Sequence, residues 1–248
     1  MDITTILGLL ATAGIVVLAV LTGQLTAVFF NVHGISIVCG GTAAAMLINT
    51  PVEYLVDAAK CLTAMFTGVG WSDPRTAIPA IVTASQNVHA RGIKALRDVD
   101  PAAGNGFLLR ASQVALEFDD PEYVRDILEN LINQDFDHKT EVVNVFRTMG
   151  VLAPMFGLVG TLIGIIDVLK HISNPELVGP SMAVAVTTAF YGILLANLVA
   201  VPLAGKLRLR HWQEYQMKRM IADAVMQMLK GTVPALLERR LQSFLVEI

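Results

Sequence analysis

The sequence predicts an all-α membrane protein with four transmembrane helices, a cytoplasmic helical domain between the second and third helices, and a cytoplasmic helical tail. Hydrophobic residues make up 54% of the 248 positions and charged residues only 16%, whereas a soluble domain carries about a quarter charged residues. Several apolar stretches are about 20 residues long, which is the length that crosses a hydrocarbon core of ~30 Å. No stretch shows the alternation typical of a strand, so we expect helices throughout.

The first two transmembrane helices are predicted within residues 1–50. Ile3–Leu21 contains no charged residue. We expect it to be retained in the protein, because the opening residues lack the basic region of a cleaved signal peptide. Gly34–Asn49 is the second predicted span. It is short and rich in small residues, which indicates that it packs against another helix rather than facing lipid along its whole length.

Charged residues return in residues 51–147, which we expect to form a cytoplasmic helical domain. Aspartates followed by proline mark helix starts there, because the carboxylate caps free N–H groups and proline suits the first helical position. After Pro121 no strong helix breaker occurs before Gly150, so the last helix of this domain is expected to continue into the membrane as the third span. The other predicted helices are Glu53–Phe66, Pro74–Ala90 and Gly104–Phe118.

Residues 148–205 are predicted to form a second membrane hairpin, in which small and hydroxyl residues recur at helical spacing. Such residues occur where membrane helices approach closely, or where a narrow polar path runs. Both interpretations remain open from the sequence. The face on the third span holds Pro154, Gly157, Thr161 and Gly164, and the face on the fourth holds Ser181, Ala185, Thr188 and Gly192.

The distribution of basic residues predicts the orientation. Of the 18 Lys and Arg residues, nine fall in 51–150 and eight in 205–248, and the two short loops between paired spans hold only Lys170. Basic residues concentrate on the cytoplasmic side, so the central domain, the tail at 206–248 and both termini are expected there. The tail should contain helices at His211–Leu229 and Ala235–Leu245.

The predicted spans lack the titrating groups that a self-contained carrier needs. Their one charged residue is Asp167, near the outer end of the third span. It pairs with Lys170 at i, i+3 or belongs to an ion path, and both alternatives stay open. If an ion crosses here, another chain must supply a carboxylate, which predicts a hetero-complex. The alternative is that the hydroxyls and glycines only pack helices.

Other function classes find little support in the sequence. The cysteines and histidines show no metal-ligand spacing, and we find no nucleophile–base pair or phosphate loop, so no catalytic residue, metal or cofactor is expected. The net charge of −3 gives no reason to expect a nucleic acid partner. A stand-alone permease is disfavoured by the lack of charge in the spans.

The stretch from Met149 to Leu207 closely resembles the MotA/PomA flagellar stator proteins, within the MotA/TolQ/ExbB proton channel superfamily. The motif AP-x-x-G-x-x-GT-x-x-G followed by YG and AN carries the resemblance. It implies an inner-membrane subunit that forms a homo-oligomer, a pentamer around a dimer of a single-span B subunit of MotB/PomB type. An essential Asp of that subunit would couple H⁺ or Na⁺ flow to torque on the rotor switch protein.

The resemblance also implies roles for particular residues. The family's channel-side proline falls on Pro154 and its first channel threonine on Thr161. The second channel position falls in the run Thr187, Thr188 and Ala189, where alanine replaces one threonine of the sodium-type pattern, so the transported ion stays open. Glycines that should pack the helices closely are Gly157, Gly160, Gly164 and Gly192.

The rotor-facing motif of the family is a basic residue, then glycine, then glutamate. Aligned on Gly92, these positions hold His89 and Arg97, and the arginine reverses the expected sign. The charged neighbours Arg91, Lys94 and Asp98 could replace them in a rotor contact, because charge steering tolerates small shifts.

The alternative function that keeps ion coupling without a flagellum is an energiser of an envelope machine, as in TolQ and ExbB.

Overall fold

A computed structural model describes residues 31–67, 74–118 and 120–244, together with single positions between 7 and 22. Within these ranges all regular structure is helical, as predicted. Most of the predicted first span and the cap expected at Asp73 lie outside the described residues. Three described helices are long and apolar enough to cross a membrane, namely Val32–Asn49, Pro121–Lys170 and Pro175–Leu229. The count of four spans therefore stays a prediction.

The chain divides into two compact units, each of which is described by itself. Unit 1 takes in Met1–Gly68 and Glu141–Leu207, and unit 2 takes in Val69–Thr140 and Arg208–Ile248. Two long helices, α7 (Pro121–Lys170) and α9 (Val201–Leu229), contribute residues to both units. The expectation that the long helix after Pro121 runs on without a break is confirmed.

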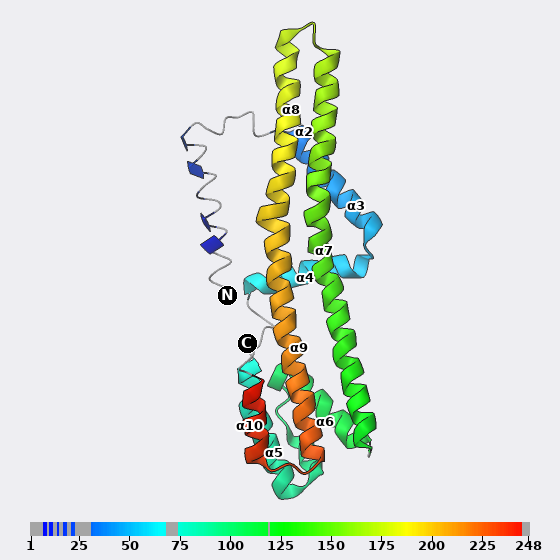
Figure 1. The fold of residues 1–248 in the computed structure, drawn as a ribbon, viewed down its shortest axis with the longest axis vertical. Helices are drawn as coiled ribbons and strands as arrows, with labels where there is room; N and C mark the ends of the chain where they lie inside the picture. Colours follow the sequence, from blue (N-terminus) through cyan, green and yellow to red (C-terminus); the bar gives the residue numbers. More distant parts are fainter. Residues whose placement is uncertain are drawn as a thin grey trace. The chain divides into compact units, whose positions relative to one another are not determined.

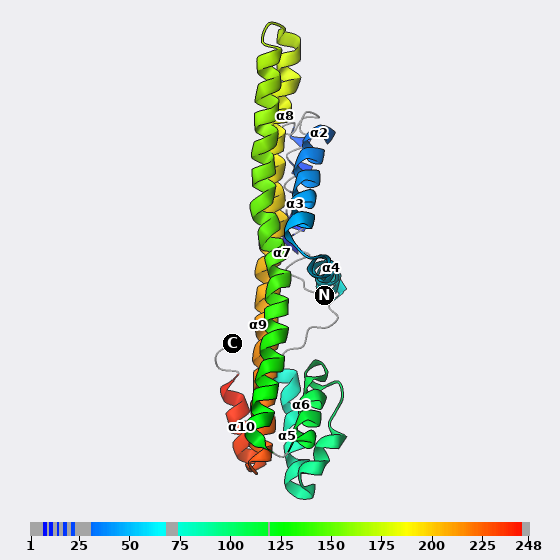
Figure 2. The same cartoon turned by 90° about the vertical axis from the view of Figure 1, so that its right-hand side faces the viewer.

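Unit 1 is built around residues 141–170 of α7 and helix α8 (Pro175–Leu194), which lie side by side in Figures 1 and 2. A short turn joins them, and the side chain of Asn174 caps α8 by accepting a hydrogen bond from the N–H of Glu176 at 3.3 Å. A π-helical segment, η5 (Leu195–Ala200), connects α8 to α9 without a break. The second predicted span is one continuous helix made of α2 (Val32–Ile35), η2 (Ser36–Gly40) and α3 (Gly41–Asn49).

Large apolar side chains remain exposed on the outer faces of α7 and α8. A soluble domain would bury such a face, whereas a lipid-facing or partner-facing helix leaves it open in the single chain. The exposed residues of α7 and α8 include Val151, Met155, Leu158, Leu162, Ile166, Leu169, Met182, Val186 and Ile193.

The helix predicted at Glu53–Phe66, after the second span, is confirmed as α4 (Val52–Thr67).

Unit 2 has a conventional apolar core. It contains α5 (Pro74–Arg91), η3 (Ile93–Asp98), η4 (Ala103–Gly106), α6 (Phe107–Glu117) and α10 (Pro234–Ser243), with the first part of α7 and the last part of α9. Helix α10 packs against α5, and Figure 1 shows the two beside each other. Fully buried core residues include Ile81, Leu96, Leu108, Leu128, Met217, Met220, Ile221, Leu237 and Leu241.

One predicted helix start is wrong. The helix expected from Gly104 begins at Phe107, because Gly104, Asn105 and Gly106 have φ values of 58°, 55° and 82°. Positive φ is incompatible with a right-handed helix and is tolerated best by glycine. A Cβ on Gly104 would also lie 2.3 Å from Cδ1 of Ile221, so the turn packs directly against α9.

Candidate functional site

The two small-residue faces predicted on the third and fourth spans pack against each other in unit 1. A Cβ added to Gly160 would lie 2.6 Å from Cβ of Thr188, and one added to Gly164 would lie 2.7 Å from Cβ of Ala185. A Cβ on Gly192 would lie 2.6 Å from the carbonyl oxygen of Ala153. These distances leave no room for a side chain, so the glycines let α7 and α8 pack closely against each other. We call this contact between α7 and α8 the seam.

Thr161 joins the two helices across the seam. Its Oγ1 lies 3.0 Å from the carbonyl oxygen of Gly157 in its own helix and 3.0 Å from that of Ala185 in α8. A hydroxyl has one proton to donate and two lone pairs that can accept or coordinate. The side chain is half-buried. Thr161 therefore both braces the seam and offers an oxygen at its edge.

Thr187 and Thr188 lie deeper in unit 1. They are 2% and 0% exposed, and their hydroxyls donate to carbonyls one turn back in α8. Helix α2 covers them, since a Cβ on Gly34 would lie 3.1 Å from Cγ2 of Thr188 and 3.4 Å from Oγ1 of Thr187. In the single chain these two threonines serve as packing residues.

Pro154 and Ala189 flank the seam and are both half-buried. A Cβ added to Gly192 would lie 3.0 Å from the Cα of Pro154. A Cβ added to Gly157 would lie 3.3 Å from the Cα of Ala189. Proline has no N–H, so the carbonyl of Gly150 lacks its usual partner four residues on, although α7 continues through this point. Pro154, Thr161, Thr188 and Ala189 of the predicted ion path thus gather along one seam, and Thr187 lies against α2.

Asp167 has a different partner from the one predicted. The hydroxyl of Ser181 in α8 donates to its Oδ2, and Nδ1 of His171 lies 3.6 Å from Oδ1. Asp167 therefore ties α7 to α8 near the turn, and the expected pair with Lys170 is not among the contacts of the described residues. Ser181 is 7% exposed.

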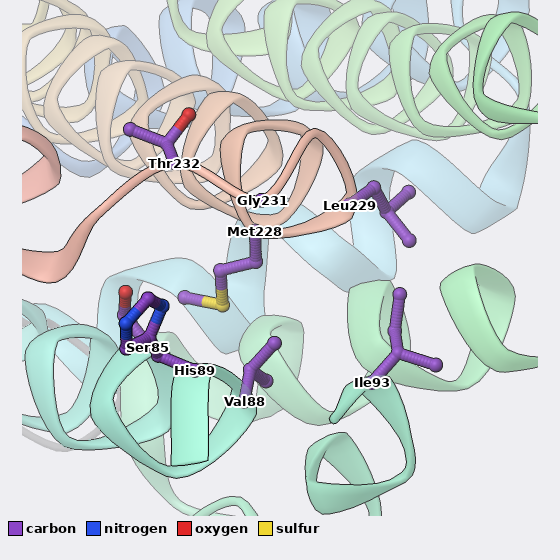
Figure 3. A pocket seen from close by; sticks show the side chains of 8 residues that line it. All are labelled: Ser85, Val88, His89, Ile93, Met228, Leu229, Gly231 and Thr232. Atoms are coloured by element: carbon purple, nitrogen blue, oxygen red, sulfur yellow. The ribbon is translucent and has the colours of Figure 1, made fainter. Parts of the chain in front are cut away.

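The residues predicted to face a rotor lie in unit 2 and are all exposed. Arg91 ends α5, and its Nη1 lies 3.6 Å from Oδ2 of Asp98 at the end of η3. Gly92 between them has a φ of 79°, which lets the chain turn sharply. The exposed residues are His89, Arg91, Lys94, Arg97 and Asp98. His89 also borders a cavity of about 300 Å³, which Figure 3 shows.

A partly buried charge network in unit 2 was not predicted. Lys139 Nζ lies 2.5 Å from Glu214 Oε1 and 3.0 Å from Asp135 Oδ2. Lys218 Nζ lies 2.7 Å from Asp135 Oδ2 and 2.9 Å from Glu214 Oε1. Two cations and two anions therefore connect α7 to α9. The i, i+4 spacing of Asp135 with Lys139, and of Glu214 with Lys218, is the signal that could have indicated it.

This network shifts the pKa values of its members. Burial opposes the charged form of Asp135 and Glu214, but the neighbouring lysines outweigh it and hold both pKa values below the usual range. The same carboxylates raise the pKa of Lys218 against the effect of burial. Burial, followed by the charge of Lys139, lowers the pKa of His211 from 6.5 to about 4, so this ring is neutral at pH 7.

In the described ranges there is no group of three or more His, Cys, Asp or Glu side chains that could hold a metal ion. The site therefore consists of an uncharged seam that carries hydroxyls in unit 1 and a charged surface in unit 2. Membrane-length helices with such a seam fit the class of membrane ion-channel subunits.

Comparisons with known proteins identify the family. The MotA/TolQ/ExbB proton channel family matches residues 102–239. The chain is 31% identical to the chemotaxis protein PomA of Vibrio alginolyticus, over 100% of this chain and 96% of that protein. It is 31% identical to motility protein A of Aquifex aeolicus (strain VF5), over 94% and 92% of the two chains.

The fold agrees with these sequence matches. The structure of C. jejuni MotAB contains a chain that superposes with a TM-score of 0.86 at 24% identity, covering 98% of this chain and 96% of that one. The protein belongs to the MotA/TolQ/ExbB proton channel family. It is therefore a channel subunit and not an enzyme, and the predicted resemblance is confirmed.

Proposed function

We propose that this chain is the A-type subunit of a flagellar stator, which couples H⁺ or Na⁺ flow to torque on the rotor. The observation that carries the proposal is the seam, which offers the Thr161 hydroxyl but no titrating group. Residues 149–166 and 178–205 contain no Asp, Glu, Lys or Arg. A coupled ion needs a carboxylate in the membrane, so a single-span B subunit supplies it from an Asp next to Thr161.

The relatives favour the flagellar version over the envelope energiser. Proteins that match this chain along nearly its whole length are named for motility or chemotaxis. The complex is a homo-oligomer of this chain, a pentamer around a B dimer, in the bacterial inner membrane with lipid on its outer faces. The exposed apolar side chains of α7 and α8 supply enough surface for lipid and for neighbouring copies.

The proposed topology has four spans with both termini in the cytoplasm. The domains are the hairpin 1–50, the cytoplasmic domain 51–147, the hairpin 148–205 and the tail 206–248. This arrangement keeps the partly buried charge network of α7 and α9 on the aqueous side of the membrane, where desolvation of its four charges costs least. It also leaves the charged residues near Gly92 in the cytoplasm, where a rotor protein is accessible.

Within the ion path, Thr161 and Pro154 border the ion most directly. Thr161 is half-buried and keeps lone pairs for an ion, while Thr187, Thr188 and Ala189 shape the seam behind it. We expect Thr161→Leu and Pro154→Leu to abolish swimming of a host that lacks its own A subunit and expresses the B partner. Thr161→Ser retains the hydroxyl and should preserve at least half of the swimming speed.

Immunoblots of membranes and co-purification of the B subunit control for assembly in these strains. The proposed role of the seam is wrong if both leucine variants assemble and swim like the parent.

The rotor contact is proposed at His89, Arg91, Lys94, Arg97 and Asp98. Exposed charges such as these add little to stability but steer partners by long-range attraction. The double variant Lys94→Glu with Arg97→Glu should reduce swimming speed at least fivefold, while ion flux through the assembled complex stays unchanged. Arg75→Glu is the matched control, because it reverses an exposed charge at the opposite end of α5, about 20 Å along the helix from His89.

A further inference from the structure

A cavity of about 300 Å³ opens at the surface of unit 2 beside the proposed rotor contact. It lies between the C-terminal half of α5 and the turn after α9, where Met228 points toward Ser85 and His89 (Figure 3). Four of its lining residues are apolar and three carry a hydroxyl or imidazole. The lining consists of Ser85, Val88, His89, Ile93, Met228, Leu229, Gly231 and Thr232.

The hydroxyl of Ser85 is the unusual feature of this cavity. Ser85 is 2% exposed, and its Oγ has no hydrogen-bond partner among the described residues. A buried polar atom without a partner costs free energy, so native proteins rarely keep one unless something else satisfies it. Because Ser85 lines the cavity, an occupant that enters with a polar tip would supply the missing hydrogen bond.

Exposed apolar and basic residues adjoin the cavity. Ile93 on its wall is 37% exposed, and Val233 and Leu236 in the following segment are 48% and 60% exposed. Lys94 follows Ile93, and Arg97 is exposed in the same short helix. The acidic residue Asp98 only offsets Arg91, with which it pairs. An apolar hollow with a basic surround fits an acidic protein segment that carries one apolar anchor.

We propose that this cavity receives one aromatic side chain with a hydrogen-bonding tip, of tyrosine or tryptophan type, from an acidic segment of the rotor protein. The proposal rests on the stator function proposed above. The cavity volume is at the lower end of the range for ligand pockets, about 300–1,000 Å³, so it suits one large side chain. Anchors of this kind dominate the energetics of protein interfaces, because an apolar body fills a pocket while its tip is bonded.

Filling the cavity tests the proposal. Thr232→Trp places an indole at the cavity, whereas Thr232→Val keeps the volume of threonine. Both variants lose the 3.0 Å hydrogen bond from Thr232 Oγ1 to Gln227 Oε1, so they differ in cavity volume and not in this contact. With the assembled A–B complex in lipid nanodiscs and purified rotor protein, the tryptophan variant should bind at least tenfold more weakly. The valine variant should stay within twofold of the parent.

A second pair of variants acts from the opposite wall. Ser85→Leu fills the cavity and should reproduce the loss, while Ser85→Ala leaves it open and should weaken binding about 2- to 10-fold, the range of one hydrogen bond. Thermal unfolding shows which variants remain folded. If the folded tryptophan or leucine variant binds as tightly as the parent, the cavity is not the anchor site.

Ion flux separates this inference from the function on which it rests. A parent complex that conducts ions and binds the rotor protein, with binding unaffected by a filled cavity, overturns the anchor site alone. A parent complex that neither conducts nor binds overturns the stator function, and the anchor site with it.

Discussion

Helix α7 belongs to both units, and its two parts use opposite means of packing. In unit 1 it meets α8 through Gly157, Gly160 and Gly164, with the Thr161 hydroxyl as the polar link. In unit 2 it meets α9 through Asp135 and Lys139, which form ion pairs with Lys218 and Glu214. In the proposed topology the difference follows from the solvent, because an unpaired charge is far more expensive in a bilayer than beside water.

This contrast is the basis of our proposal that a partner chain completes the ion path. Residues 149–166 of α7 have close packing and the Thr161 hydroxyl, but no titrating side chain, and Asp167 follows at the end of the seam beside Ser181. The part that carries charges uses them in a closed set of four, with each lysine bonded to both carboxylates. A titrating group for transport must therefore come from a partner, which is the central element of the proposed function.

The largest expected effect comes from adding volume to the seam. Gly160→Leu has no room beside Thr188, so α7 and α8 must separate, and we expect complete loss of swimming with reduced assembly. Gly179→Leu is the matched control, since a Cβ on Gly179 meets nothing within 4 Å. Swimming speed and the amount of complex recovered from membranes check this. A Gly160→Leu strain that swims normally would show that the seam is not closely packed.

The next largest effect is expected in the charge network of unit 2. Lys218→Met leaves two carboxylates with one lysine in a partly buried network. We expect a loss of about 2 kcal/mol, within the range of ~1.5–3 kcal/mol for a hydrogen bond to a charged group. At this chain length that corresponds to a fall in Tm of about 4–8 °C. The control is Lys60→Met, whose partner Asp57 forms an exposed pair that contributes about 0–1 kcal/mol. Equal Tm values for the two variants would contradict the network's structural role.

A smaller effect is expected from acid. His211 has a pKa of about 4 in the folded chain, against 6.5 for the ordinary side chain. The unfolded chain therefore binds a proton more readily, and the stability that the neutral ring contributes is complete above pH 6.5 and lost as pH falls toward 4. Asp135, Lys139 and Glu214 are the charged groups around this ring.

Thermal unfolding between pH 7 and pH 4 measures this effect. We expect a fall of a few degrees in Tm for the parent and a flatter curve for His211→Gln, since glutamine does not titrate. Parallel curves for the two proteins would contradict a neutral, buried His211.

Much of the fold could be predicted from the sequence, because long apolar stretches and Asp-Pro helix starts are local signals. The helix after Pro121 was expected to run on without a break past Gly150, and it does. The start at Phe107 was missed, because positive φ at Asn105 depends on the packing of the turn against Ile221. Helical periodicity does not reveal such a tertiary contact.

The site was only partly predictable. Spacing placed Gly157, Thr161 and Thr188 on two faces where helices could approach closely, but it left open whether close packing or a polar path was the reason. Nor could it show that α2 covers Thr187 and Thr188, because that contact joins residues more than 150 positions apart. The contact of Asp167 with Ser181 in α8 was likewise not predictable, since Ser181 comes close only when the hairpin forms.

Ion flux into lipid vesicles tests the central claim most directly, with the purified chain alone compared with the chain co-purified with its single-span B partner. The account predicts no flux above the lipid background for the chain alone. It predicts flux for the complex that is lost when the membrane Asp of the B subunit is replaced by Asn. Equal flux from the chain alone would show that its seam is a complete ion path, and would contradict the claim that a partner supplies the carboxylate.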